Sequence, residues 1–111
     1  KLIQVFINLI DNSISLSPEG SKILIQLEKI DEKFISLRFY DQGKGIDLKD
    51  SEKIFERFYS DRHENIKNHT GLGLSIAREI IDHMNGNISL DKSNKSDYPG
   101  ACFLINLPVK Q

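Results

Sequence analysis

Amide and carboxylate side chains recur near the start of the chain, within a segment that is otherwise almost entirely apolar. Helical spacing places these polar residues in one stripe on a helix over residues 2–16: Gln4, Asn8, Asp11, Asn12 and Ser15. Asparagine and aspartate are mediocre helix formers, and buried amides need hydrogen-bond partners. The stripe therefore fits either a helix face that binds a polar ligand or the solvated face of an amphipathic core helix.

A carboxylate and two glycines follow the second of two predicted strands. Residues 22–30 and 34–41 are rich in β-branched and aromatic residues and form the two strands. Alternation along the second strand places Asp41 on the core face, where a charge needs a partner. Gly43 and Gly45 let the backbone turn and approach another group closely. Asp41 can accept a hydrogen bond from an exocyclic amine here, although a turn of this composition is also common in proteins without such a site.

Two glycines open the next predicted helix. Thr70 is expected to be its N-cap, and Gly71 and Gly73 fall in the first turn. Free backbone N–H groups and the helix dipole favour an anion at that position. The residues that follow form an apolar, core-facing stripe, and Asn85-Gly86 is a stop signal. The pattern is neither a Walker loop nor a Rossmann fingerprint, because it contains no Gly-Lys-Ser/Thr and no strand leads directly into it.

The three motifs complement one another chemically. They supply an acceptor for an adenine amino group, an amide ligand for a metal ion and a cradle of N–H groups for phosphates. Each motif alone is weak evidence, but their order and separation along one short chain make a chance combination a poor explanation. Together they predict an ATP site.

The same motifs resemble those of the catalytic, ATP-binding domain of bacterial sensor histidine kinases. This domain belongs to the GHKL superfamily, which also includes DNA gyrase, Hsp90 and MutL. Residues 8–12 resemble the N box, 41–45 the G1 box, 54–59 the F box and 70–74 the G2 box, and 100–108 resembles the closing strand. The resemblance covers nearly all of residues 1–111, which are expected to form one domain.

The resemblance implies a role for each matching position. Asn12 would bind Mg²⁺ and Asn8 would support the same phosphate end, which makes both residues catalytic. Asp41 would accept the adenine amino group. The other nucleotide-binding positions that the resemblance implies are Gly43, Gly45, Ile46, Thr70, Gly71, Leu72, Gly73 and Leu74.

A lid over the nucleotide is also implied, at about residues 59–69, with Phe55 and Phe58 anchoring its base. Ser15 departs from the family pattern, because kinases of this family often carry a lysine at that position. One expected phosphate contact is therefore missing. The candidate phosphate contacts around the lid are Arg57, Arg62 and Lys67.

The resemblance also implies which reaction the domain supports. ATPases of the superfamily carry a water-activating glutamate where this chain has Asn8, and an amide cannot act as a general base. The chain is therefore expected to transfer the γ-phosphate to a histidine in two-component signalling, with little hydrolysis. The alternatives are a degenerate nucleotide-binding module, which Ser15 favours, and an anti-sigma-type serine kinase of the same fold.

Composition limits the other possibilities. The chain has 111 residues, a net charge of −1 with acids and bases interspersed, and one cysteine. These values predict one modest core, no nucleic-acid partner and no internal disulfide, with Cys102 as a small buried side chain. No signal peptide or membrane-spanning segment is visible in these residues. The three histidines do not form a metal-binding pattern.

The expected fold is α+β: a two-layer α/β sandwich, the Bergerat ATP-binding fold, with a mixed, mainly antiparallel sheet and helices on one face. The expected element order is helix, strand, strand, a short helix around 51–55, lid, helix, strand, strand. The chain starts inside a predicted helix, so it is expected to be a fragment. By resemblance it is a monomeric, cytoplasmic domain without membrane contact. Its parent would be an inner-membrane sensor whose helical hairpin carries the acceptor histidine and whose signal passes to a response regulator.

Overall fold

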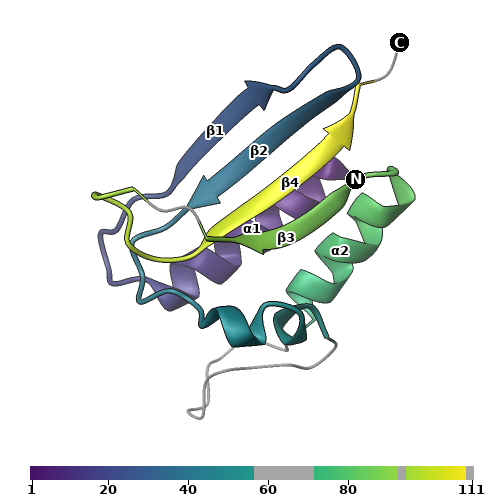
Figure 1. Cartoon of the computed structure of the whole chain (residues 1–111). Coiled ribbons are helices and arrows are strands. Elements are labelled where there is room, and N and C mark those ends of the chain that lie inside the picture. The colour runs from purple at the N-terminus through teal and green to yellow at the C-terminus, as the bar shows by residue number, and fades with distance from the viewer. Residues whose placement is uncertain (57–71, 93–94, 110–111) are drawn as a thin grey trace.

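Each of the two helices is followed in the chain by a pair of strands (Figure 1). The computed structural model describes residues 1–56, 72–92 and 95–109. The elements are α1 (Leu2–Leu16), β1 (Leu24–Lys29), β2 (Phe34–Tyr40), the 3₁₀ turns η1 (Leu48–Asp50) and η2 (Lys53–Phe55), α2 (Gly73–His83), β3 (Asn87–Asp91) and β4 (Cys102–Pro108). The predicted element order is confirmed for these residues, except that two 3₁₀ turns replace the single short helix. Asp47 Oδ1 accepts a hydrogen bond from the Lys49 N–H at 3.0 Å, a local alternative to helical pairing.

The four strands form one sheet in the order β1-β2-β4-β3, and every pairing is antiparallel. The central pair, β2 and β4, runs in register from Phe34 opposite Pro108 to Tyr40 opposite Cys102. The prediction of a mixed sheet is therefore wrong for the described strands. The connection through α2 gives β2 and β3 the same direction, but β4 lies between them, so they do not pair.

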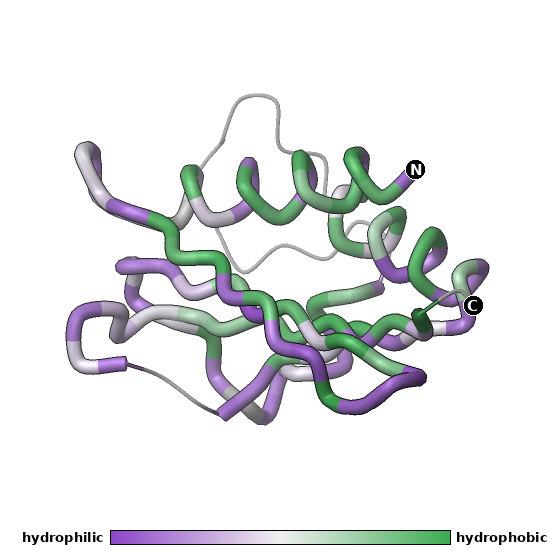
Figure 2. The backbone as a smooth tube through the Cα atoms, turned by 90° about the horizontal axis from the view of Figure 1, so that it is seen from above, coloured by the Kyte–Doolittle hydropathy of each residue, from purple (hydrophilic) through white to green (hydrophobic). Residues whose placement is uncertain are grey.

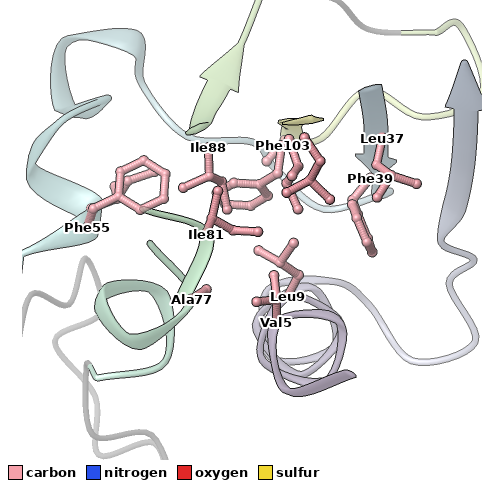
Figure 3. Packing of buried hydrophobic residues seen from close by; sticks show 13 residues of the cluster. Val5, Leu9, Leu37, Phe39, Phe55, Ala77, Ile81, Ile88 and Phe103 are labelled. Atoms are coloured by element: carbon pink, nitrogen blue, oxygen red, sulfur yellow. The ribbon is translucent and has the colours of Figure 1, made fainter. Parts of the chain in front are cut away.

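Both helices lie on one side of the sheet, which gives the predicted two layers (Figure 2). The core fills the space between the layers (Figure 3). Burying each large apolar side chain there contributes about 1.5–3 kcal/mol. The core therefore holds α1 and α2 side by side against the sheet, and its buried side chains include Val5, Leu9, Leu37, Phe39, Ala77, Ile81, Ile88 and Phe103.

Helix α1 is apolar on more than its buried side. Val5 and Leu9 are fully buried, whereas Ile3 and Ile14 are 73% and 63% exposed. The described residues therefore leave part of the apolar surface of α1 uncovered. In the described part of the chain, neither α1 nor α2 combines the length and the hydropathy that crossing a bilayer requires.

Helix α2 ends where the sequence predicts. Asn85 has a φ of 63°, in the left-handed region, and the Gly86 N–H donates to the Ile81 carbonyl at 3.0 Å. Both features are typical of a helix C-terminus. The following turn leads directly into β3, so the far end of α2, where Gly73 lies, is held over the opposite end of the sheet.

Cys102 is buried, as predicted, but it lies on the sheet face opposite the helices. It pairs in register with Tyr40 and with Asp91, while its neighbour Phe103 points into the core. Burial, reinforced by the nearby Asp91 carboxylate, raises the pKa of the Cys102 thiol to about 11. The thiol is therefore protonated at neutral pH and is a poor nucleophile.

Candidate functional site

Helix α1 contacts both of the other motifs, which come from distant parts of the chain. The Asn8 side-chain N–H donates to the Gly73 carbonyl at 3.0 Å, so it reaches the start of α2. The Ser13 hydroxyl donates to Asp41 Oδ2 at 3.3 Å, so it reaches the end of β2. The three motifs predicted from the sequence therefore converge on one helix.

Asn8 is held in place from two sides. Besides the bond from its nitrogen to Gly73, its Oδ1 accepts a hydrogen bond from the Gln4 side chain at 2.8 Å. Gln4 and Asn8 are one helical turn apart, so their side chains lie on the same face. Both ends of the Asn8 amide are thus engaged within the protein, and the residue links α1 to the first turn of α2.

Asp41 is almost completely buried, with 1% of its surface exposed. Its Oδ1 accepts hydrogen bonds from the backbone N–H groups of Gly43 and Ala101, each at 3.0 Å. Its Oδ2 accepts the longer bond from the Ser13 hydroxyl. A carboxylate oxygen has two lone pairs, so Oδ1 is satisfied by these two donors while Oδ2 can accept one more.

The backbone of Asp41 is paired with the segment that leads into β4. The Asp41 N–H donates to the Ala101 carbonyl, and the Gly100 N–H donates to the Asp41 carbonyl, both at 3.1 Å. Asp41 thus bonds to two successive residues, Ala101 and Gly100, just beyond the paired ends of β2 and β4. The carboxylate is therefore fixed at the end of the central strand pair.

Asn12 has a buried donor without a partner. The side chain is 7% exposed, and among the described residues its Nδ2 makes no hydrogen bond. A buried, unpaired amide N–H costs free energy, and a phosphate oxygen would satisfy it. Asn12 precedes Ser13 on α1, so this donor and the hydroxyl that contacts Asp41 come from neighbouring residues of one helix.

The start of α2 supplies a second group of donors. The first intrahelical bond runs from the Ile76 N–H to the Leu72 carbonyl at 2.9 Å. The N–H groups of Gly73, Leu74 and Ser75 precede it and have no partner within the helix. Together with the helix dipole they favour an anion at this end.

The prediction that Thr70 caps this helix is wrong, because α2 begins at Gly73 and its N-cap is Leu72. The Leu72 carbonyl already accepts bonds from the Ile76 N–H and the Ser75 hydroxyl at 2.9 Å. Gly73 is the first residue of α2, and Gly71 lies outside the described residues. The Gly73 carbonyl is the one that Asn8 holds.

Gly45 lies in a turn that requires glycine. Its φ is 85°, in the left-handed region that side chains rarely adopt. A cavity of about 320 Å³ opens beside it, with Ile46, Leu90 and Ala101 in its walls. This cavity shares Gly45 and Ile46 with the predicted site, but Asn12 and Asp41 do not line it. A second cavity, of about 190 Å³, lies on the first turns of α2 and is lined by Leu72 and Ser75, among others.

Several predicted positions lie outside the described residues: Arg57, Phe58, Arg62, Lys67, Thr70, Gly71 and the lid at 59–69. Phe55, the other predicted lid anchor, is buried in the core. Ser15 is exposed, and its hydroxyl donates to the carbonyl of Asn12 at 3.0 Å. It therefore engages its own helix backbone.

The residues that hold Asp41 are not among those predicted from the sequence. Ser13 lies off the polar stripe, and its one signal in the sequence is a hydroxyl on the apolar side of a buried helix. Gly100 and Ala101 were assigned only to the closing strand. The hydrogen bond from Ala101 to Asp41 joins residues 60 positions apart, so no local sequence pattern indicates it.

Known proteins resemble this chain in sequence. The sequence profile of the histidine kinase-, DNA gyrase B- and HSP90-like ATPase family matches residues 1–111. The chain is 35% identical to the sensor histidine kinase WalK of Bacillus subtilis (strain 168), over all of this chain and 18% of WalK. It is 37% identical to the sensor protein ChvG of Agrobacterium fabrum, over 97% of this chain and 19% of ChvG.

Solved structures share the fold. The mycobacterial sensor histidine kinase MprB superimposes with a TM-score of 0.82 at 29% identity, over 95% of this chain and 68% of that one. The catalytic domain of histidine kinase ThkA superimposes with a TM-score of 0.75 at 33% identity, over 95% of this chain and 65% of that one. The chain thus spans less than a fifth of the length of WalK or ChvG and about two thirds of these solved chains.

Proposed function

The chain belongs to the histidine kinase-, DNA gyrase B- and HSP90-like ATPase family, and we propose that it binds Mg–ATP and donates the γ-phosphate to a histidine elsewhere in its parent protein. Relatives that it matches are named as a sensor histidine kinase and a sporulation kinase. The proposal assigns to this chain the nucleotide-binding, catalytic part of such an enzyme. The acceptor histidine, on a helical hairpin, lies outside these residues.

The observation that carries the proposal is the convergence of the three motifs on α1. Asn8 and Ser13 are five residues apart, which corresponds to about 7.5 Å along the helix axis. Ser13 contacts the Asp41 carboxylate, and Asn8 contacts the start of α2. Helix α1 therefore contacts an acceptor for an amine at one point and the phosphate-binding start of α2 at another. This arrangement suits a ligand with a base at one end and phosphates at the other.

The base end is assigned to Asp41. Its Oδ2 has an unused lone pair, because the Ser13 hydroxyl is the donor it has among the described residues. An adenine amino group would donate to that oxygen, whereas guanine presents a carbonyl oxygen at the same ring position. Asp41 therefore selects adenine, because guanine would place its carbonyl oxygen, another hydrogen-bond acceptor, against the acceptor oxygen of Asp41.

The residues present fit Mg²⁺ as well. Mg²⁺ in nucleotide sites takes one or two protein oxygens and completes its shell with phosphates and waters. The Asn12 amide can supply one oxygen, and its unpartnered Nδ2 suits a phosphate oxygen. When bound, the ion would neutralise charge on the phosphates. We assign this role to Asn12, and we assign to Asn8 the positioning of the first turn of α2.

Phosphoryl transfer needs positioning and charge stabilisation more than covalent chemistry from the protein. The N–H groups at the start of α2 and the Asn12 amide would orient the phosphates. The nucleophile would be an imidazole nitrogen of the acceptor, which attacks the γ-phosphorus while ADP leaves. We further propose that the phosphate then passes to a response regulator, that the parent is an inner-membrane sensor, and that this domain acts on its cytoplasmic side as a monomer.

One consequence is that the isolated chain should hydrolyse ATP very slowly. Asn8 is an amide and cannot deprotonate water, and its amide is already engaged by Gln4 and Gly73. We expect the chain alone, with Mg–ATP, to release phosphate well below one turnover per minute, on the order of a thousand times slower than ordinary enzymatic turnover. Phosphate release measured with a coupled assay tests this.

The comparison variant for that assay is Asn8→Glu, which supplies a carboxylate at the same place but loses the bond to the Gly73 carbonyl. Its phosphate release should equal or exceed that of the unchanged chain. Rapid hydrolysis by the unchanged chain would favour an ATPase and contradict the proposal.

A further inference from the structure

We propose that Gly100 is a positioning residue for base recognition: its missing side chain lets the backbone of residues 100–101 hold the Asp41 carboxylate in the orientation that reads adenine. The inference rests on the proposed function, because it takes the Asp41 carboxylate as the acceptor of the adenine amino group. Gly100 would act only through Asp41.

Gly100 packs against Asp41 with no room for a side chain. A Cβ at this position would overlap Asp41 Oδ1 and would lie 2.7 Å from the Gly43 backbone nitrogen and 2.9 Å from the Asp41 carbonyl oxygen. Two of these atoms are backbone, and the third belongs to a short, buried side chain. None of them is the free end of a flexible group that could move aside, so an added methyl must displace the carboxylate or the turn.

The atoms that a methyl would displace are the ones that fix the carboxylate. Oδ1 accepts the Ala101 and Gly43 N–H groups at 3.0 Å, and the Gly100 N–H donates to the Asp41 carbonyl. With Oδ1 held by two backbone donors, the χ2 torsion of Asp41 is set and Oδ2 is left facing Ser13. Losing either bond frees the carboxylate to rotate, and the direction of its open lone pair changes.

The need for glycine here differs from the need at Gly45 and Gly20. Those two residues have φ values of 85° and 83°, and a Cβ on either would meet only ordinary contacts or none within 4 Å. Gly86 is the closer match, because a Cβ there would overlap the Asn106 carbonyl and lie 2.9 Å from Leu107 Cδ2. Gly86 follows the C-terminus of α2, at the end of the helix away from Gly73.

These facts define an experiment with a matched control. ATP and purine riboside triphosphate, which lacks the 6-amino group, are titrated into the unchanged chain, Gly100→Ala and Gly86→Ala by calorimetry with Mg²⁺. We expect the unchanged chain to bind ATP at least about tenfold more tightly than the analogue, since a hydrogen bond to a charged group is lost. Gly100→Ala should reduce that preference to within about twofold by losing ATP affinity. Gly86→Ala should keep the preference even where it lowers the melting temperature.

The outcomes separate the inference from the proposed function. A Gly100→Ala protein that folds and keeps the full preference for ATP overturns the inference and leaves the proposed function standing. An unchanged chain that binds both nucleotides equally shows that Asp41 does not read the amino group, so the inference fails together with the assignment of the base end to Asp41. An unchanged chain that binds neither nucleotide contradicts the proposed function itself.

A second measurement applies if Gly100→Ala does not fold. The amide protons of Gly43 and Ala101 are followed by NMR in the unchanged chain and in Asp41→Asn. Both should move upfield together, because each loses a charged acceptor. An Ala101 resonance that stays in place would mean that this backbone does not hold the carboxylate.

Discussion

Asp41→Asn should weaken ATP binding by about 100-fold or more while the protein remains folded. The substitution preserves shape, and the asparagine oxygen can still accept the N–H groups of Gly43 and Ala101. The position of Oδ2 then carries an N–H₂ donor, which would face the amino group of adenine, another donor. Loss of a hydrogen bond to a charged group accounts for about a tenfold to 100-fold change, and the opposed donors add to it.

The measurement is the ATP dissociation constant, with circular dichroism to confirm the fold. Asp82→Asn is the matched control, because Asp82 is an exposed aspartate near the end of α2, away from Gly73. It should bind ATP as the unchanged chain does. GTP provides a second readout: its carbonyl oxygen can accept from the new N–H₂ group, so the preference for ATP over GTP should shrink. An unchanged dissociation constant in folded Asp41→Asn would remove Asp41 from base recognition.

Asn12→Ala should reduce Mg²⁺-dependent phosphoryl transfer by at least about 100-fold, the scale expected for losing a preorganised group that acts on transition-state charge. Its side chain is buried, yet its Nδ2 has no partner among the described residues. Removing it therefore costs little hydrogen bonding in the protein itself. ADP binding without metal should weaken by no more than about tenfold, because without the ion only the hydrogen bond from Asn12 Nδ2 to a phosphate is lost.

Transfer to the parent hairpin, measured across a titration of Mg²⁺, tests the role of Asn12. Asn87→Ala is the control, since Asn87 is an exposed asparagine at the start of β3 whose side chain bonds only to Asn106 among the described residues. Transfer at the normal rate by Asn12→Ala would show that another group binds the metal. A loss of ADP affinity equal to the loss of transfer would assign Asn12 to general nucleotide binding.

The fold was predictable in outline because its signals are local. Residue patterns located both helices, β1 and β2, and the Asn85-Gly86 stop matched the end of α2. The family resemblance located β4, and β3 was expected only from the element order. Whether every strand pair in the sheet is antiparallel was not predictable in the same way. Whether β2 and β3 pair depends on β4 lying between them, and the chain reaches β4 only after α2 and β3 are complete.

Only those residues of the candidate site that have a local sequence signal were predictable. Asn8, Asn12 and Asp41 stood out because polar groups at apolar, regularly spaced positions need an explanation. Ser13, Gly100 and Ala101 did not, because their importance comes from contacts with Asp41 across 28 to 60 residues of sequence. The start of α2 was predicted from residue type alone: Thr70 is a good N-cap by composition, but the helix begins at Gly73, whose carbonyl Asn8 contacts.

The most direct test of the central claim combines this chain, ATP labelled at the γ-phosphate and the helical hairpin of its parent. The account predicts that label appears on the hairpin, that its appearance requires this chain and Mg²⁺, and that the product is labile to acid and stable to alkali, as phosphohistidine is. An acid-stable phosphoserine would assign the chain to the anti-sigma-type serine kinases. Tight ATP binding with no transfer to the hairpin under any condition would identify a nucleotide-binding module without kinase activity, and would contradict the account.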